Sequence, residues 1–419
     1  MHTITLLVIL RRIILLAILI LPQRFWIGRG WQLASRIPRR WLRTTAHAFL
    51  AVVSIAIALI LFDHIFHKFI PAPVSAFITP VFQLWVFTSI FAYFCVKAVH
   101  LVEWIWSQLM RLRAALTHAP APDPGRRTFF RYAASFVGAV PFVAGLYGYA
   151  RERLQFQIVR VAVPIPNLPA ALNGLRIVQL SDIHIGDYMP ADEIRRAVAL
   201  ANSLSADLAV ITGDFVSDAG DPLALCIQEL SRLHAPLGVW GCNGNHEIYA
   251  GAEDAAERLF TQNGMTLLRQ KAVQLDWKSE SFNLIGVDYQ HNVHLTGSAL
   301  PTLGGVEPLV RRDQFNLLLS HNPNTFSSAA GLGIALTLSG HTHGGQINVE
   351  ILSHSFSPAK FMTPFVAGLY QLPNAQSANQ PADNPPAFLY VNRGLGTLGV
   401  PARIGARPEI TLLTLQTAS

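Results

Sequence analysis

Charged residues are scarce in this chain. Asp, Glu, Lys and Arg make up only 14% of its 419 residues, whereas 51% are apolar. So little charge favours a protein with membrane segments. The net charge of +7 comes mostly from arginines beside apolar runs. It therefore indicates membrane orientation and argues against a nucleic-acid surface.

Cysteine is also rare. The three cysteines, Cys95, Cys226 and Cys242, show no Cys-x-x-Cys spacing. Because Cys95 falls inside an apolar run, at most one disulfide, between Cys226 and Cys242, is available to the rest of the chain. Two buried thiols are the favoured alternative. Cysteine usage does not define the compartment.

Long apolar runs are concentrated near the start of the chain. The length predicts two or three domains, and we expect residues 1–150 to form a membrane region with three or four transmembrane helices. Residues 3–22 are interrupted by Arg11 and Arg12, and 13–21 alone is too short to cross. A poor span, an interfacial helix and a signal-like start therefore all stay open. Three further runs approach the ~20 apolar residues of a spanning helix: 46–62, 76–96 and 132–150.

Arginines cluster in the connections before and after the central pair of runs. The positive-inside rule places both connections in the cytoplasm, so the last helix ends outside. The domain that follows would then face away from the cytoplasm at the inner membrane. Arg126 and Arg127, ahead of an apolar segment, also resemble a twin-arginine export signal, and the alternative is an ordinary basic flank. Both interpretations give the same topology.

From Gln157 onward, strand-like runs alternate with helix-like runs, which is typical of an α/β fold. Five of the strand-like runs end in a carboxylate, an imidazole or an Asn. Open α/β sheets bind ligands just past the carboxyl ends of their strands, so these side chains predict a metal site. The endings are Asp182-Ile183-His184, Gly213-Asp214, Gly244-Asn245-His246-Glu247, His321 and Gly340-His341-Thr342-His343.

This order of motifs resembles the calcineurin-like metallophosphoesterases, and Gly-His-Thr-His-Gly-Gly-Gln at 340–346 resembles their membrane-associated branch. The resemblance covers about residues 150–416. It includes Asn-Arg-Gly-Leu-Gly-Thr at 392–397 and Gly-Ala-Arg-Pro-Glu-Ile at 405–410. It implies an α/β fold, a four-layer αββα metallophosphoesterase sandwich over residues 151–419, after an N-terminal transmembrane helical region.

The resemblance also implies two divalent metal ions. Neutral His and Asn ligands with one bridging carboxylate leave such ions enough positive charge to bind a phosphate, and these ligands suit Mn²⁺, Fe and Zn²⁺ alike. In extended backbone, the side chains of residues two apart point the same way. Asp182 with His184, and His341 with His343, would then both point at the ions. The first ion would be held by Asp182, His184, Asp214 and His343, and the second by Asp214 as bridge, Asn245, His321 and His341.

Four further residues carry more specific expectations. By the resemblance, His246 is the catalytic imidazole that protonates the leaving oxygen or stabilises charge on the phosphoryl group; the alternative is a further ligand or a packed neighbour. Adjacency suggests that Glu247 orients His246 by a hydrogen bond. Arg393 would bind substrate phosphate, and the alternative is a structural salt bridge. Asp288 would reach the site, and the favoured alternative is an ordinary turn residue.

The chain departs from the phosphoprotein-phosphatase branch at one position. That branch has Gly-Asp-x-x-Asp-Arg, whereas here Phe215, Val216 and Ser217 follow Asp214. The aspartate that partners the catalytic His in that branch therefore has no counterpart. This argues against protein phosphatase activity and leaves metal binding intact.

The resemblance implies hydrolysis of a phosphomonoester or phosphodiester by a metal-activated hydroxide. A membrane anchor favours a lipid-linked or envelope substrate, and no nucleic-acid partner is expected. The alternative is a membrane sensor that binds metal or phosphate without turnover. Residues 371–386, rich in Pro, Asn, Gln and Ala, predict an exposed insertion.

Overall fold

The computed structural model describes residues 2–66, 72–117, 124–290, 303–351, 354–361, 363–372 and 386–418. These residues form two compact units. The first comprises Met1–Gly148 with Gly399–Pro401, and the second comprises Tyr149–Leu398 with Ala402–Ser419.

The first unit is helical. Within the described residues, four helices are long and apolar enough to cross a membrane. Their candidate spans are Ile13–Ser35, Arg40–Leu59, Ile78–Leu116 and Gly125–Leu154. The helices themselves are α1 (His2–Ser35), α2 (Arg40–Phe66), α3 (Ala72–Thr117) and α4 (Pro124–Ala150).

Helix α1 is longer than the apolar run that predicted it. The helix continues beyond residue 22 through Arg24 and Arg29 to Ser35, since arginine favours helix almost as strongly as leucine does. A stretch that is too short to cross by itself, 13–21, thus becomes part of a candidate span of 23 residues. The number of helices that cross a membrane stays a prediction.

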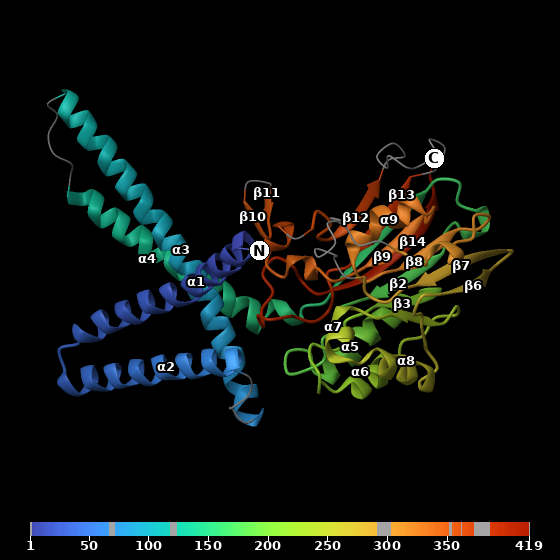
Figure 1. Ribbon diagram of the computed structural model, residues 1–419, viewed down its shortest axis with the longest axis horizontal. Coiled ribbons are helices and arrows are strands. Elements are labelled where there is room, and N and C mark those ends of the chain that lie inside the picture. The colour runs from blue at the N-terminus through green and yellow to red at the C-terminus, as the bar shows by residue number, and fades with distance from the viewer. Residues whose placement is uncertain are drawn as a thin grey trace. The chain divides into compact units, whose positions relative to one another are not determined.

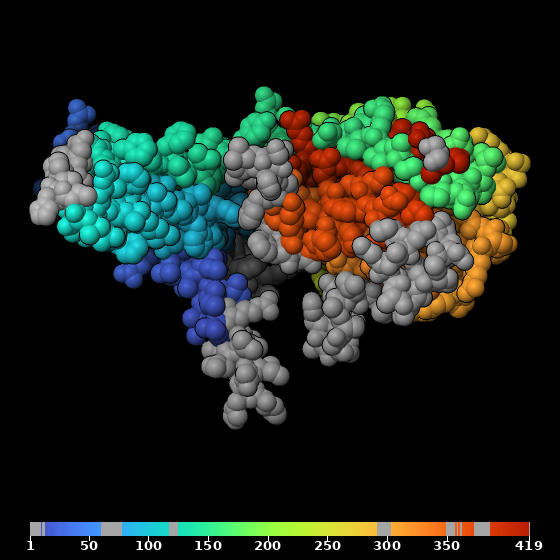
Figure 2. Space-filling model, turned by 90° about the horizontal axis from the view of Figure 1, so that it is seen from above, coloured from blue at the N-terminus to red at the C-terminus, as the bar shows by residue number. Residues whose placement is uncertain are grey.

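Helices α3 and α4 lie side by side in both views of the molecule (Figures 1 and 2). A Cβ added at Gly145 of α4 would lie 2.4 Å from Thr88 of α3, so the glycine is needed for this approach. The buried Gln23 side chain of α1 donates to Ser89 Oγ at 2.7 Å and accepts from Trp85 Nε1 at 2.8 Å. Small residues and interhelical hydrogen bonds of this kind hold apolar helices together in a membrane.

The described part of the second unit contains two six-stranded sheets. Their facing sides bury one apolar core, in which Ile177 and Leu413 of the first sheet cluster with Leu317 and Leu338 of the second. The first sheet has the order β1 (Gln157–Ile165), β14 (Glu409–Thr417), β2 (Arg176–Leu180), β3 (Leu208–Thr212), β4 (Val239–Cys242), β5 (Thr266–Leu267). The second has the order β12 (Gly368–Leu372), β13 (Ala387–Val391), β9 (Leu336–Ser339), β8 (Asn316–Leu319), β7 (Glu280–Gly286), β6 (Lys271–Trp277). A separate hairpin pairs β10 (Val349–Ile351) with β11 (His354–Phe356).

Helices cover the outer faces of both sheets (Figure 1). On the first sheet, α5 (Ala191–Asn202), α6 (Leu223–Leu230) and α8 (Glu253–Gln262) bury a second apolar cluster. On the second sheet, α9 (Phe326–Gly331) packs Phe326 against Leu389. The resulting order of helix, sheet, sheet and helix confirms the predicted α/β class and its four αββα layers.

Two smaller predictions have different outcomes. Cys226 and Cys242 are buried free thiols, which confirms the favoured interpretation and excludes their disulfide. Of the predicted insertion, Gln371 and Leu372 belong to β12 and pair with β13. Residues 373–385 lie outside the described residues.

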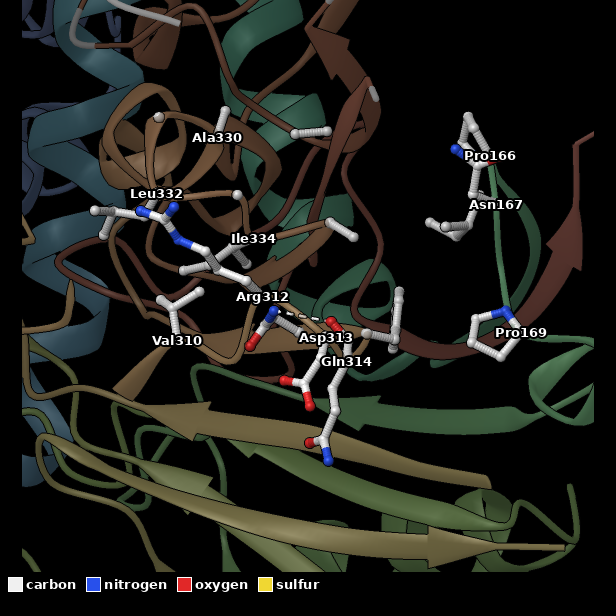
Figure 3. A pocket seen from close by; sticks show the side chains of 17 residues that line it. Pro166, Asn167, Pro169, Val310, Arg312, Asp313, Gln314, Ala330, Leu332 and Ile334 are labelled. Atoms are coloured by element: carbon white, nitrogen blue, oxygen red, sulfur yellow. Dashed lines mark hydrogen bonds between the residues drawn. The ribbon is translucent and has the colours of Figure 1, made fainter. Parts of the chain in front are cut away.

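A cavity of about 460 Å³ lies in the second unit, at the amino ends of β8 and β9. Figure 3 shows Arg312, Asp313 and Gln314 along one wall, and Pro166, Asn167 and Pro169 on the other. None of the predicted metal ligands lines it. Because those ligands follow the carboxyl ends of the strands, the cavity is distinct from the candidate metal centre.

Candidate metal centre

The predicted ligands come together at one edge of the two sheets. Strands β2, β3 and β4 are parallel neighbours in the first sheet, and β8 and β9 are parallel neighbours in the second. Parallel strands bring their carboxyl ends to the same edge. The loops after these five strands therefore deliver all seven predicted ligands: Asp182, His184, Asp214, Asn245, His321, His341 and His343.

One group of donors joins the loops after β2 and β9. The Nε2 atoms of His184 and His343 lie 3.2 Å apart, and His343 Nε2 lies 3.4 Å from Asp182 Oδ1. All three side chains are buried. Their donor atoms lie within 4.8 Å of one another, which is close enough to share one ion.

A second group joins the loops after β3, β4, β8 and β9. His321 Nε2 lies 3.1 Å from Asp214 Oδ2, and His341 Nδ1 lies 2.8 Å from Asn245 Oδ1. Asp214, His321 and His341 again have donor atoms within 4.8 Å of one another. Asn245 is the first residue of α7 (Asn245–Ala250), so its place depends on how that short helix begins.

Asp214 lies between the two groups. Its Oδ2 atom is 3.1 Å from His321 Nε2 of the second group and 3.5 Å from His184 Nε2 of the first. Burial alone would raise the pKa of this carboxyl, but the neighbouring His321 and His184 imidazoles hold it well below its usual range. The side chain is therefore an ionised carboxylate in the position of a bridge.

The donor set fits divalent metal ions. Donor atoms bound at roughly 2.1 Å to one ion lie about 3.0–3.4 Å apart, which is close to the separations seen here. The buried Nε2 atom of His321 faces Asp214 Oδ2 at 3.1 Å, while its Nδ1 donates to the Thr212 carbonyl at 2.6 Å. A carbonyl that fixes one imidazole nitrogen and leaves the other for metal is the usual outer partner of a histidine ligand.

The histidines differ in their charge state. Burial and the positive charge of His321 lower the pKa of His341 to about 4, and burial with the charges of His184 and Arg403 lowers that of His343 well below its usual value. Burial opposes charge on His321 too, but Asp214 raises its pKa to about 10. A metal ion would displace the proton of His321, because only a neutral imidazole can bind it.

The backbone of these loops is not extended, contrary to what we expected for Asp182 with His184 and for His341 with His343. Five of the ligands have positive φ angles of 49° to 76°: Asp182, His184, Asp214, His341 and His343. The left-handed region costs a non-glycine residue free energy and is found mostly where a site requires it. The pairs still converge, but they do so through tight turns and not through strand alternation.

Two glycines are needed for the close packing of the loops. A Cβ added at Gly340 would lie 2.0 Å from Ser181 Oγ and 2.2 Å from Asp182 Oδ2. At Gly244 it would lie 2.1 Å from Asp214 Oδ1. This close packing allows backbone amides to reach the carboxylates, since His341 N donates to Asp182 and His246 N donates to Asp214.

His246 is adjacent to the first donor group and half-buried. Its ring lies edge-on to that of His184, with centroids 4.8 Å apart, and its Nδ1 lies 2.6 Å from the Ser217 carbonyl oxygen. Glu247 does not contact it, so the expectation from adjacency is wrong. The buried Glu247 carboxylate instead accepts from the backbone amides of Asp214, Phe215, Val216 and Gly244.

Arg393 and Asp288 have structural partners. Arg393 Nε donates to Glu409 Oε2 at 2.5 Å, which is the salt bridge weighed as the alternative. Its role in substrate binding stays a prediction. Asp288 accepts from Asn243 Nδ2 at 2.8 Å and Arg269 Nε at 2.9 Å. It therefore supports the loop after β4 without belonging to a donor group.

Sequence reasoning missed Arg403, which contacts this site. Its buried guanidinium lies against His343 and the loop after β13. Burial lowers its pKa to about 10. No pattern in the sequence indicates this role, because its acceptors are mainly backbone carbonyls that the fold brings together.

Known proteins resemble this chain in sequence. Residues 175–345 match the model of the family described as calcineurin-like phosphoesterase. A transmembrane protein with metallophosphoesterase domain from Bos taurus is 33% identical over 317 residues, which are 71% of this chain and 65% of that protein. Its counterpart from Danio rerio is 29% identical over 284 residues, covering 66% and 61%. The metallophosphoesterase YkuE of Bacillus subtilis is 29% identical over 301 residues, covering 70% and 98%.

The match over residues 175–345, with relatives named metallophosphoesterases, confirms a calcineurin-like phosphoesterase domain, as inferred from the motifs. The chain spans less than two thirds of the length of the two vertebrate proteins and nearly all of the bacterial one. Membership of the membrane-associated branch stays a prediction.

Proposed function

We propose that this protein is a membrane-anchored phosphoesterase that hydrolyses phosphomonoester or phosphodiester bonds with two divalent metal ions. The observation that carries the proposal is the position of Asp214, whose Oδ2 atom contacts both donor groups. A buried carboxylate between two sets of imidazoles is what a dinuclear site requires and what a single-ion site does not.

Each donor group would hold one ion. Two ions supply a nucleophile at neutral pH and neutralise the phosphate oxygens. The metal is Mn²⁺, Fe or Zn²⁺ by its ligand chemistry. The first ion would take Asp182, His184, Asp214 and His343, and the second would take Asp214, Asn245, His321 and His341.

His246 would be the proton donor. A carbonyl oxygen only accepts hydrogen bonds, so the contact with Ser217 fixes the hydrogen on Nδ1 of His246. Nε2 is then the nitrogen that exchanges a proton with the leaving oxygen. Its ring contact with His184 would keep it beside the first ion. Its donor atom also lies within 4.8 Å of those of His184 and Asp214, so a role as a further ligand is the alternative.

The setting suggests the substrate class. We assign residues 1–150 to a membrane region and residues 151–419 to the hydrolase domain. Arginines in the connections before and after the central helices favour a domain facing away from the cytoplasm, at the inner membrane. A catalytic domain tethered there favours a lipid-linked or envelope phosphoester.

The test is hydrolysis by the full-length chain in detergent. Bis-p-nitrophenyl phosphate and p-nitrophenyl phosphate, with and without Mn²⁺, would separate diesterase from monoesterase activity. Asp214→Asn should abolish turnover, whereas Asp218→Asn at an exposed carboxylate four residues away should not. Metal binding without turnover of these esters or of phospholipid substrates would favour the sensor alternative.

A further inference from the structure

Arg403 is the largest side chain among those fully buried in the described residues. A buried cation is costly unless its hydrogen bonds are satisfied. Within the described residues, its hydrogen bonds are to backbone carbonyls and one imidazole nitrogen, and not to a carboxylate. The free energy of burying this charge is therefore offset by the backbone of the loops around it.

Most of these carbonyls belong to the loop after β13. Nε of Arg403 donates to Gly396 at 3.0 Å, and Nη2 donates to Arg393 at 2.9 Å and to Gly394 at 3.2 Å. The loop after β13 is in turn hydrogen-bonded to the loop after β2, which carries Asp182 and His184. Leu395 N donates to the Ser181 carbonyl at 3.0 Å and Gly396 N donates to the Asp182 carbonyl at 2.7 Å.

The same guanidinium also reaches the loop after β9. Nη1 donates to the His343 carbonyl at 3.4 Å, and Nη2 lies 3.5 Å from Nδ1 of the His343 ring. Arg403 therefore links the loops that carry Asp182, His184 and His343 of the first donor group, although the loop after β9 also carries His341 of the second. In the part of the chain that the structure describes, its hydrogen bonds do not reach Asn245, His321 or His341.

We infer that Arg403 is a positioning residue for the first ion and not for the second, acting through the loops that carry Asp182, His184 and His343. The inference rests on the proposed two-ion site. Only the planar fork of an arginine can donate to carbonyls on several sides at once, whereas lysine offers a single point of attachment. Outer residues that orient metal ligands typically account for about 10- to 100-fold in metal affinity.

The test is titration of full-length variants with Mn²⁺. The readouts are the electron paramagnetic resonance spectrum and the number of metal ions bound per chain. Arg403→Lys and Arg403→Met should keep one tight ion and weaken the other by about 10- to 100-fold. The coupled two-ion spectrum should give way to that of one isolated Mn²⁺. This spectrum should match that of His343→Ala, which keeps the second ion, and differ from that of His321→Ala, which keeps the first. Arg407→Gln, at a half-exposed arginine nearby, is the matched control and should bind like the wild type.

Three outcomes would overturn the inference. They are unchanged binding of both ions, equal weakening of both, and loss of folding in both Arg403 variants, which would make the residue a general determinant of the fold. A wild type that binds no Mn²⁺ would overturn the inference together with the metal sites. A wild type that binds two ions but hydrolyses no ester would overturn the proposed function only, since this titration does not measure turnover.

Discussion

The Nδ1 atom of His246 lies 2.6 Å from the carbonyl oxygen of Ser217. The phosphoprotein-phosphatase pattern has an aspartate at this position that partners the catalytic imidazole, and this chain lacks it. The backbone of the same residue provides a partner instead. The Ser217 hydroxyl contacts a different imidazole, because its oxygen lies 3.1 Å from Nδ1 of the predicted ligand His184.

Replacing Ser217 should therefore have a small effect on catalysis. Ser217→Ala removes the hydroxyl beside His184 but keeps the carbonyl that orients His246. We expect kcat to fall less than about 10-fold, in line with the loss of one neutral hydrogen bond. Steady-state kinetics on a chromogenic ester would check this, and a loss as large as that of a His246 variant would contradict it.

Replacing His246 should impair proton transfer and spare metal binding. In His246→Gln we expect kcat to fall by about 10²–10⁴-fold, the usual contribution of a general acid, with two Mn²⁺ ions still bound. His234→Gln, at an exposed histidine, is the control. If the His246 variant binds only one ion, the residue is a ligand, which was the alternative interpretation.

Glu247 should matter for stability more than for chemistry. Its buried carboxylate accepts hydrogen bonds from four backbone amides of the loops after β3 and β4. A glutamine side chain would offer them only one acceptor oxygen. Glu247→Gln should lower the free energy of unfolding by about 3 kcal/mol, because hydrogen bonds to a charged group are lost. Thermal melting beside the exposed-site variant Glu280→Gln would measure it; equal melting temperatures would refute this role.

Removal of metal should destabilise the second unit. An ion that binds only the folded state stabilises it by about 2.7 kcal/mol when present at 100 times its Kd. We expect a chelator to lower the melting temperature of the wild type and to have a much smaller effect on Asp214→Asn. An equal shift in both would show that the stabilising ion is not bound at Asp214.

The sequence predicted which side chains come together better than it predicted their surroundings. Asp182, Asp214 and His321 each follow a short buried strand, so the carboxyl edges of the two sheets bring them together whatever the details of the loops. The positive φ angles of His184 and His343 were not predicted, because extended and left-handed turns can carry the same residues. The members of each pair do converge, but through left-handed turns and not through strand alternation.

The contacts outside the ligands depend on tertiary structure. Adjacency suggested that Glu247 orients His246, but the first turn of α7 directs Glu247 to the amides of a neighbouring loop. Arg403 is far in sequence from His343, and its partners are carbonyls that any residue carries. Such contacts leave no pattern of residue types to find.

The most direct test of the two-ion phosphoesterase is turnover of bis-p-nitrophenyl phosphate and p-nitrophenyl phosphate as a function of Mn²⁺ bound per chain. The account predicts that hydrolysis reaches its plateau at two ions and is absent in Asp214→Asn. A plateau at one ion would contradict the bridging role of Asp214. Two bound ions with no hydrolysis of either ester, or of phospholipid substrates, would contradict the enzymatic function itself.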